Sequence, residues 1–283
     1  MKVRIKGAVS VTAVVALSVV AGAFGSSRVS AQQPPAAGAQ QGGRGQGRGG
    51  AQAGAPPSAR ANAPIDLTGY WVALVTDDWR WRMVTPPKGD VMYLPVTDAA
   101  RRAAEQWDPA KDEAAGDACK GYGAGGIMRL PERLHVTWDG DNVLKMEIDT
   151  GQQTRVFTFG DAQPPAGDPT WQGFSRAQWD LPGAARGRGG RGAAPGPRPG
   201  STMRVVTTRM RPGYWQKNGV PYGANAVMTE WFTTLSEPNG DTYLLVTKQL
   251  EDPQFIQGVY YRTVQFKKQN DATGWNPTPC SAR

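Results

Sequence analysis

The chain has 283 residues and a formal net charge of +8 at pH 7, from 32 basic and 24 acidic residues. Residues 1–64 carry seven basic residues and no acid, and residues 183–201 carry four and no acid, which leaves 21 basic and 24 acidic residues elsewhere. A nucleic-acid-binding domain would gather its basic residues on a folded face, so this distribution argues against a nucleic-acid partner.

The N-terminal residues 1–31 predict a signal peptide. Three basic residues precede an uncharged apolar run from Ala8 to Phe24, and small residues suit cleavage after Ala23 or Ala31. The run is too short and too rich in Ala and Gly for a membrane span. We therefore expect a periplasmic or secreted protein with no stable membrane insertion after signal removal.

Residues 32–64 contain no aromatic or branched aliphatic residue, so we expect a disordered Gly/Pro/Arg-rich linker. A second low-complexity tract at 183–201 is expected to be a long surface loop between two strands.

From residue 65 to 283, short runs of alternating apolar and polar residues predict one all-β domain. A long excursion follows the first strand and contains one expected helix, Asp98–Trp107, with Thr97 as its N-cap. The expected strands are Gly69–Thr76, Arg133–Trp138, Val143–Asp149, Thr154–Phe159, Phe174–Asp180, Thr202–Met210, Ala226–Leu235, Thr242–Leu250 and Val259–Lys267.

The hairpin between Arg133–Trp138 and Val143–Asp149 has a register that its apolar residues dictate. They share one face of the sheet only if Asp139 pairs with Val143. The three loop residues then end in Asn142, which suits a left-handed conformation.

The next turn, Thr150-Gly151, sets Met146 opposite Arg155 and directs this arginine toward the apolar side. Alternation also places Glu230 on the apolar side of its strand. A carboxylate among apolar neighbours has a raised pKa and can act as a general acid or base, which makes Glu230 the candidate catalytic residue. A structural ion pair between Arg155 and Glu230 is the alternative.

Cys119 and Cys280 are the only cysteines. An even count in an exported chain predicts one disulfide, with two unpaired thiols as the alternative. The chain has a single histidine, His135. Zinc and nonheme iron need more ligands than this, so we expect no metal and no cofactor.

The triplet Gly69-Tyr70-Trp71 at the start of the first strand resembles the lipocalin (calycin) signature. In that family the tryptophan plugs the closed end of an antiparallel barrel, and an arginine from near the last strand packs over it. Arg262 stands in a matching position. The resemblance implies a lipocalin-like barrel of about eight or nine strands. The stretches around "IMRLPERLHVTW" and "MTEWFTTLSEPNGDTYLLVTKQLEDP" also resemble a group of exported, functionally unassigned proteins of environmental bacteria.

Ten tryptophans are the most distinctive feature of the composition. Most are expected in the core, and aromatic residues in loops are expected to rim a pocket. We therefore expect a protein that holds a hydrophobic or amphipathic small molecule in its barrel. The alternatives are a cofactor-free hydratase, isomerase or lyase that uses Glu230, and a cell-envelope interaction protein with a solid core. The expected ligand-binding residues are Arg155, Glu230, Trp79, Trp81, Trp171, Trp215 and Tyr222.

Overall fold

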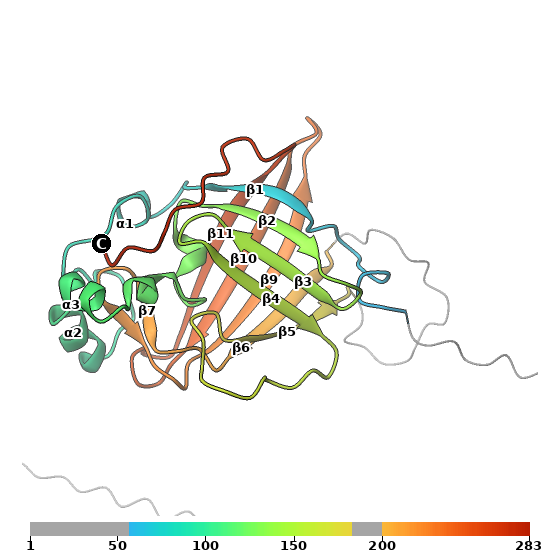
Figure 1. Ribbon diagram of the computed structural model, residues 1–283. Helices are drawn as coiled ribbons and strands as arrows, with labels where there is room; N and C mark the ends of the chain where they lie inside the picture. The colour runs from blue at the N-terminus through green and yellow to red at the C-terminus, as the bar shows by residue number, and fades with distance from the viewer. Residues whose placement is uncertain (1–56, 183–199) are drawn as a thin grey trace, which may run out of the picture. The chain divides into compact units, whose positions relative to one another are not determined.

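The computed structural model describes residues 57–182 and 200–283. The expected signal peptide, residues 32–56 of the expected linker and most of the 183–201 loop lie outside these residues. Within the described part, nine strands close into a barrel with the order β1-β11-β10-β9-β6-β5-β4-β3-β2 (Figure 1). The all-β fold class is confirmed. The barrel strands are β1 (Gly69–Leu74), β2 (Arg133–Trp138), β3 (Val143–Ile148), β4 (Gln153–Phe159), β5 (Phe174–Asp180), β6 (Thr202–Thr208), β9 (Val227–Ser236), β10 (Thr242–Glu251) and β11 (Val259–Gln269).

The expected helix is α2 (Asp98–Glu105), and the Thr97 hydroxyl accepts a hydrogen bond from the Ala100 amide at 3.3 Å. The helix ends before Trp107. Several short elements were not predicted: the helices α1 (Trp79–Arg82) and α3 (Pro109–Ala114), the 3₁₀ turns η1 (Ala118–Tyr122) and η2 (Ile127–Arg129), and the hairpin of β7 (Gly213–Gln216) and β8 (Val220–Tyr222). All of them lie at one end of the barrel (Figure 1).

The predicted hairpin register is confirmed. The Asp139 amide donates to the Val143 carbonyl at 2.9 Å, and Met146 stands opposite Arg155. The left-handed residue of the loop is Gly140, at φ 80°, and not Asn142. The Asn142 side chain instead accepts a hydrogen bond from the Ala59 amide at 2.8 Å, which ties the chain before the barrel to this hairpin.

One strand pair departs from the expected antiparallel arrangement. β4 and β5 are parallel, with Phe157 opposite Ser175. The connection between them, residues 160–173, is long enough to return along the barrel before β5 begins, as a parallel pairing requires. Every other neighbouring pair in the barrel is antiparallel.

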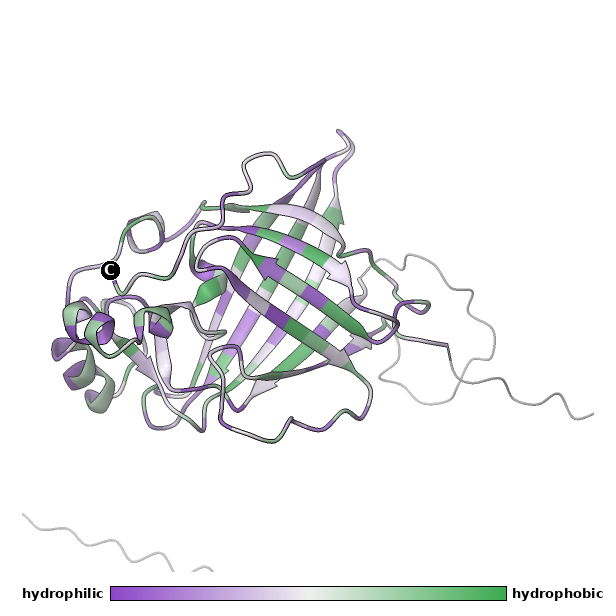
Figure 2. Cartoon of the chain, viewed as in Figure 1, coloured by the Kyte–Doolittle hydropathy of each residue, from purple (hydrophilic) through white to green (hydrophobic). Residues whose placement is uncertain are grey.

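Hydrophobic and hydrophilic residues alternate along the barrel strands (Figure 2). Successive side chains of a strand point to opposite faces, so one set enters the barrel. Trp71 is fully buried there, and its indole N–H donates to the Leu67 carbonyl at 2.9 Å. The interior around Trp71 is packed with the buried side chains of Leu134, Val136, Leu144, Met146, Phe157, Met203, Val205, Phe232, Leu244, Val246 and Phe266.

The cation over the Trp71 ring is Lys268, at 4.6 Å, and not Arg262 as the lipocalin resemblance implied. The register explains the difference, because Trp71 stands opposite Lys268 in β11. Arg262 lies six residues earlier, roughly 20 Å along the strand, where its guanidinium pairs with Asp78. Gly69 has φ +94°, which favours glycine at the first position of the triplet.

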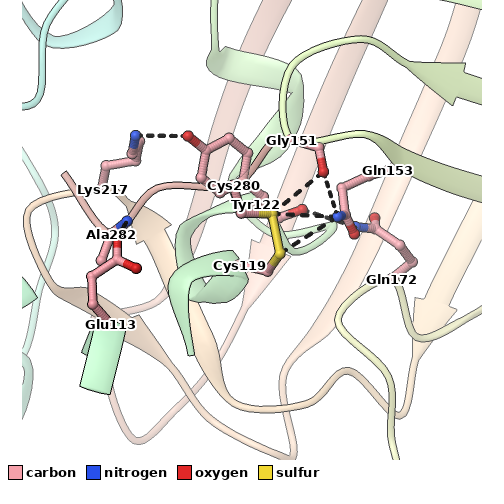
Figure 3. The surroundings of a disulfide bond; sticks show 9 residues. All are labelled: Glu113, Cys119, Tyr122, Gly151, Gln153, Gln172, Lys217, Cys280 and Ala282. Carbon is pink, nitrogen blue, oxygen red and sulfur yellow. Dashed lines mark hydrogen bonds between the residues drawn. A yellow bond between two sulfur atoms is a disulfide. The ribbon is translucent and has the colours of Figure 1, made fainter. Parts of the chain in front are cut away.

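The predicted disulfide is confirmed. Cys119 in η1 is bonded to Cys280 in the C-terminal segment, with the Cα atoms 5.0 Å apart. Next to it, the Gly151 amide donates to the Thr278 carbonyl at 2.9 Å. The Gln153 side chain contacts both sulfur atoms of the disulfide (Figure 3). A disulfide indicates an oxidising, extracellular compartment. Among the described residues, no helix is long and apolar enough to cross a membrane.

Candidate functional site

One end of the barrel is covered by residues 118–130, which we call the cover segment. Its Tyr122, Ile127 and Met128 belong to the same buried cluster as the barrel interior. The Gly125 carbonyl accepts a hydrogen bond from the buried ammonium of Lys248 in β10, at 2.6 Å. A Cβ atom on Gly126 would lie 2.7 Å from the Tyr214 carbonyl oxygen, so the glycines allow this segment to pack closely.

A layer of charged side chains lies in the barrel, on the side of the cover segment. Arg155 and Glu230 form a bidentate ion pair of 3.0 and 2.5 Å, and both side chains are 0 % exposed. Lys248 stands opposite Glu230 in the β9–β10 register. Glu132, just before β2, is also buried, and neither of its carboxyl oxygens has a hydrogen-bond partner among the described residues.

Burial changes the ionisation of two members of this layer. It raises the pKa of the Glu132 carboxyl well above its usual range; Asp149 adds to this, while Arg155 and Arg82 oppose it. Burial, together with the charge of Arg129, lowers the pKa of Lys248 to about 7. Glu132 is therefore held toward its neutral form, and Lys248 is close to losing its charge at neutral pH.

Above this layer, arginines at the covered end bind two aspartates. Arg82 pairs with Asp77 at 3.1 Å and also donates to the carbonyl of Arg129 at 2.9 Å. Asp78 pairs with Arg129 at 3.2 Å and with Arg262. The adjacent aspartates at the end of the first strand thus act as ion-pair partners that fix the approach of α1 to the barrel.

A pocket of about 250 Å³ opens beside the cover segment, and we call it the covered-end pocket. Trp81, Tyr122 and Trp215 give it aromatic walls, and Arg82 and Lys217 bring positive charge. Lys217 lies 4.7 Å over the Tyr122 ring and donates to the Tyr122 hydroxyl at 3.0 Å (Figure 3). The complete lining is Trp81, Arg82, Met83, Val84, Thr85, Gly121, Tyr122, Gly126, Arg129, Leu130, Pro131, Thr150, Trp215, Gln216, Lys217 and Arg283.

The covered-end pocket has a one-sided charge. Within the described part of the chain its lining includes four basic residues and no aspartate or glutamate. One of the basic groups, the buried Arg82 guanidinium, keeps an Nη2 atom without a hydrogen-bond partner among the described residues. Buried donors are normally satisfied, so this unpaired one is an exception within the described residues.

The residues expected to bind a ligand do not all meet at this pocket. Trp81 and Trp215 line it. Tyr222 is buried under the glycines of the cover segment, and Trp79 is exposed. Trp171 lies under the Arg211 guanidinium at 4.2 Å, away from the lining. Arg155 and Glu230 meet as the pattern indicated, but as a closed ion pair that does not line the pocket.

His135 lies on the outer side of the barrel wall. Its ring stacks on Tyr70 at 4.2 Å and its Nδ1 lies 3.1 Å from a Glu147 oxygen. No group of three or more His, Cys, Asp or Glu side chains that could hold a metal ion occurs in residues 57–182 and 200–283.

Sequence reasoning missed Arg82, Arg129, Lys217 and the buried pair of Glu132 and Lys248. For Glu132 and Lys248 the sequence held a signal, because each is separated by an even number of residues from the inward-facing apolar residues of β2 or β10 and so lies on the same face.

Comparisons of the chain with protein-family models, with curated proteins and with solved structures found no match.

Proposed function

We propose that the chain is an exported, lipocalin-like protein that binds a small amphipathic anion in the covered-end pocket. The export signal expected at residues 1–31 and the disulfide are consistent with this compartment. The proposal keeps the ligand class expected from the sequence but moves the site from the barrel interior to its covered end.

The observation that carries the proposal is the lining of the pocket. Aromatic and aliphatic walls favour an apolar ligand body. Two of the four basic lining residues are held in ion pairs with Asp77 and Asp78, and the other two, Lys217 and Arg283, favour a negative charge on the ligand. A volume of about 250 Å³ suits a ligand somewhat smaller than the drug-sized molecules that occupy roughly 300–1,000 Å³.

Two other locations receive less support. Glu230 has both oxygens engaged by Arg155 and is fully buried, so an acid–base role in a barrel enzyme lacks access to a substrate. A larger hollow of about 660 Å³ lies over β5 and β6. Its lining includes an acidic residue, Asp161, which pairs with Arg176, so the hollow lacks the uniformly basic set of charged side chains that lines the covered-end pocket.

The test compares octanoate with octanol, two probes with the same alkyl chain that differ in charge. Binding to the purified mature protein is measured by isothermal titration calorimetry below the concentration at which octanoate aggregates. We expect octanoate to bind roughly tenfold or more tightly than octanol, which corresponds to about 1.4 kcal/mol.

Lys217→Gln removes one positive charge from the pocket and should weaken octanoate binding without changing octanol binding. Lys145→Gln is the matched control, since Lys145 pairs with Glu147 on the outer wall at 3.4 Å. Equal affinity for both probes, or an equal effect of the two substitutions on octanoate binding, would contradict the proposal.

A further inference from the structure

Apolar side chains gather in one exposed segment at the covered end. Trp79, Met83, Val84, Met92 and Tyr93, between 54 and 82 % exposed, all belong to α1 and the loop that follows it. We call these five residues the apolar rim. Water-exposed side chains of this size in one segment mark an interaction surface.

Trp81 joins the two halves of the apolar rim. It lines the covered-end pocket together with Met83 and Val84, and it lines a neighbouring pocket of about 130 Å³ together with Met92 and Tyr93. Its ring meets the Tyr93 ring edge-on at 6.3 Å. Four of the five rim residues therefore line one or the other of these two neighbouring openings.

The exposed charge of the same segment is positive. Two basic residues of 79–93, Arg80 and Lys88, are exposed, while Arg82 is buried, and the single acid of this segment is Asp90. The Asp90 side chain is only 14 % exposed and is engaged by Arg80 at 3.7 Å and by the Trp81 indole at 3.1 Å. Arg80, whose guanidinium lies 5.2 Å over the Trp81 ring, is 58 % exposed.

Five protruding side chains are too few for a stable protein interface, which takes about 20–30 residues on each side. Trp and Tyr favour the boundary between lipid headgroups and acyl chains, and nearby basic residues are attracted to anionic headgroups. From the combination of exposed aromatic side chains and positive charge, we propose that the apolar rim docks onto the surface of an anionic lipid bilayer. Docking in this way would direct the pocket openings toward the lipid. The proposal does not depend on what the covered-end pocket binds.

The test is partitioning of the full mature chain onto vesicles of phosphatidylcholine with 30 % phosphatidylglycerol, followed by co-sedimentation and by the tryptophan emission maximum. Trp79→Ala/Tyr93→Ala should reduce partitioning by roughly tenfold or more, because two large apolar side chains no longer enter the bilayer. The wild-type emission maximum should shift to shorter wavelength on binding, and the shift should shrink in this variant.

Val156→Ala/Leu235→Ala is the matched control, since both residues are exposed apolar side chains on β4 and β9, outside the rim. The basic tracts at 32–64 and 183–201 are the same in every variant, so the difference between variants measures the rim alone. Arg80→Gln removes one exposed positive charge. It should weaken binding to the vesicles that contain phosphatidylglycerol several-fold and leave binding to pure phosphatidylcholine vesicles unchanged.

Three results would overturn the proposal: no binding to either vesicle, an equal loss in the rim and control variants, or a concentration-dependent dimer that only the rim variant loses. The last result would assign the rim to a second copy of the chain. Octanoate binding by the Trp79→Ala/Tyr93→Ala protein is measured in parallel, so that failure of the docking proposal is distinguishable from failure of the pocket proposal.

Discussion

Arg155 and Glu230 carry opposite charges in the barrel without any contact with water. Their bidentate geometry compensates for desolvation only as long as both partners are present. Each therefore depends on the other, although the pair itself adds little beyond what well-packed apolar side chains of similar size would provide.

Glu230→Gln should lower the free energy of unfolding by about 3–5 kcal/mol, because Arg155 keeps a buried charge without a counter-ion. Arg155→Met/Glu230→Leu should recover most of that loss, since both charges are then gone. Urea titration monitored by circular dichroism measures both variants. As a control, Asp180→Asn breaks the half-exposed pair with Arg204 and should cost less than about 1 kcal/mol. If the double variant were less stable than Glu230→Gln, the pair would be a net source of stability.

Glu132 gives the protein a pH dependence of definite sign. Its carboxyl has a folded pKa above the ordinary value of 4.5, chiefly because of burial, so the folded state binds a proton that the unfolded chain has released. The stability associated with this proton is fully present below about pH 4.5 and is lost as the pH rises through the folded pKa.

Glu132→Gln keeps the shape of the side chain and removes the titration. The stability gained from this substitution should be small at pH 4 and should grow from pH 4 to pH 8, as measured by urea unfolding at several pH values. Glu237→Gln, in the exposed turn after β9, serves as the control and should show no such growth. A constant difference at every pH would mean that Glu132 is not neutralised by burial.

At the scale of the elements, alternation was sufficient for the barrel strands. Each of the nine expected strands matches an observed one, because one face of every strand packs into a closed interior and so carries a period of two. The same alternation is sufficient to place Glu132 and Lys248 inside the barrel. Each lies two residues before an inward-facing leucine, Leu134 or Leu250, and therefore on the same face of its strand.

The covered end was not predictable in this way. The stretch from Gly121 to Gly126 has no hydrophobic period, and its path is set by close contacts with Tyr214 and Tyr222, far away in the sequence. The β7–β8 hairpin is likewise short and buried on both faces, which leaves no alternation to detect. The pocket depends on these elements, which is why only Trp81 and Trp215 among its lining residues were anticipated.

At the scale of the whole molecule, the disulfide connects the two parts of the chain that make the pocket. Cys119 lies in η1 just before Gly121 and Tyr122, and Cys280 lies three residues before Arg283. Gly121, Tyr122 and Arg283 line the pocket. Lys217 bridges the same two parts by donating to Tyr122 and to the main-chain oxygen of Arg283 at 2.5 Å. The barrel strands are hydrogen-bonded independently of this connection.

Cys119→Ala/Cys280→Ala should therefore affect stability and the pocket to different degrees. Loss of a cross-link over 161 residues costs up to about 5 kcal/mol in the chain-entropy model, so the midpoint of urea unfolding should fall. The far-ultraviolet circular dichroism of the folded state should stay that of the wild type, because the barrel does not need the cross-link. Octanoate affinity should fall several-fold, because the walls formed by Tyr122 and Arg283 are no longer held together.

Reduction of the wild-type protein with dithiothreitol should reproduce both effects and leave the alanine variant unchanged. Undiminished octanoate binding after reduction would show that the hydrogen bonds of Lys217 and Gly151 hold these walls without the disulfide.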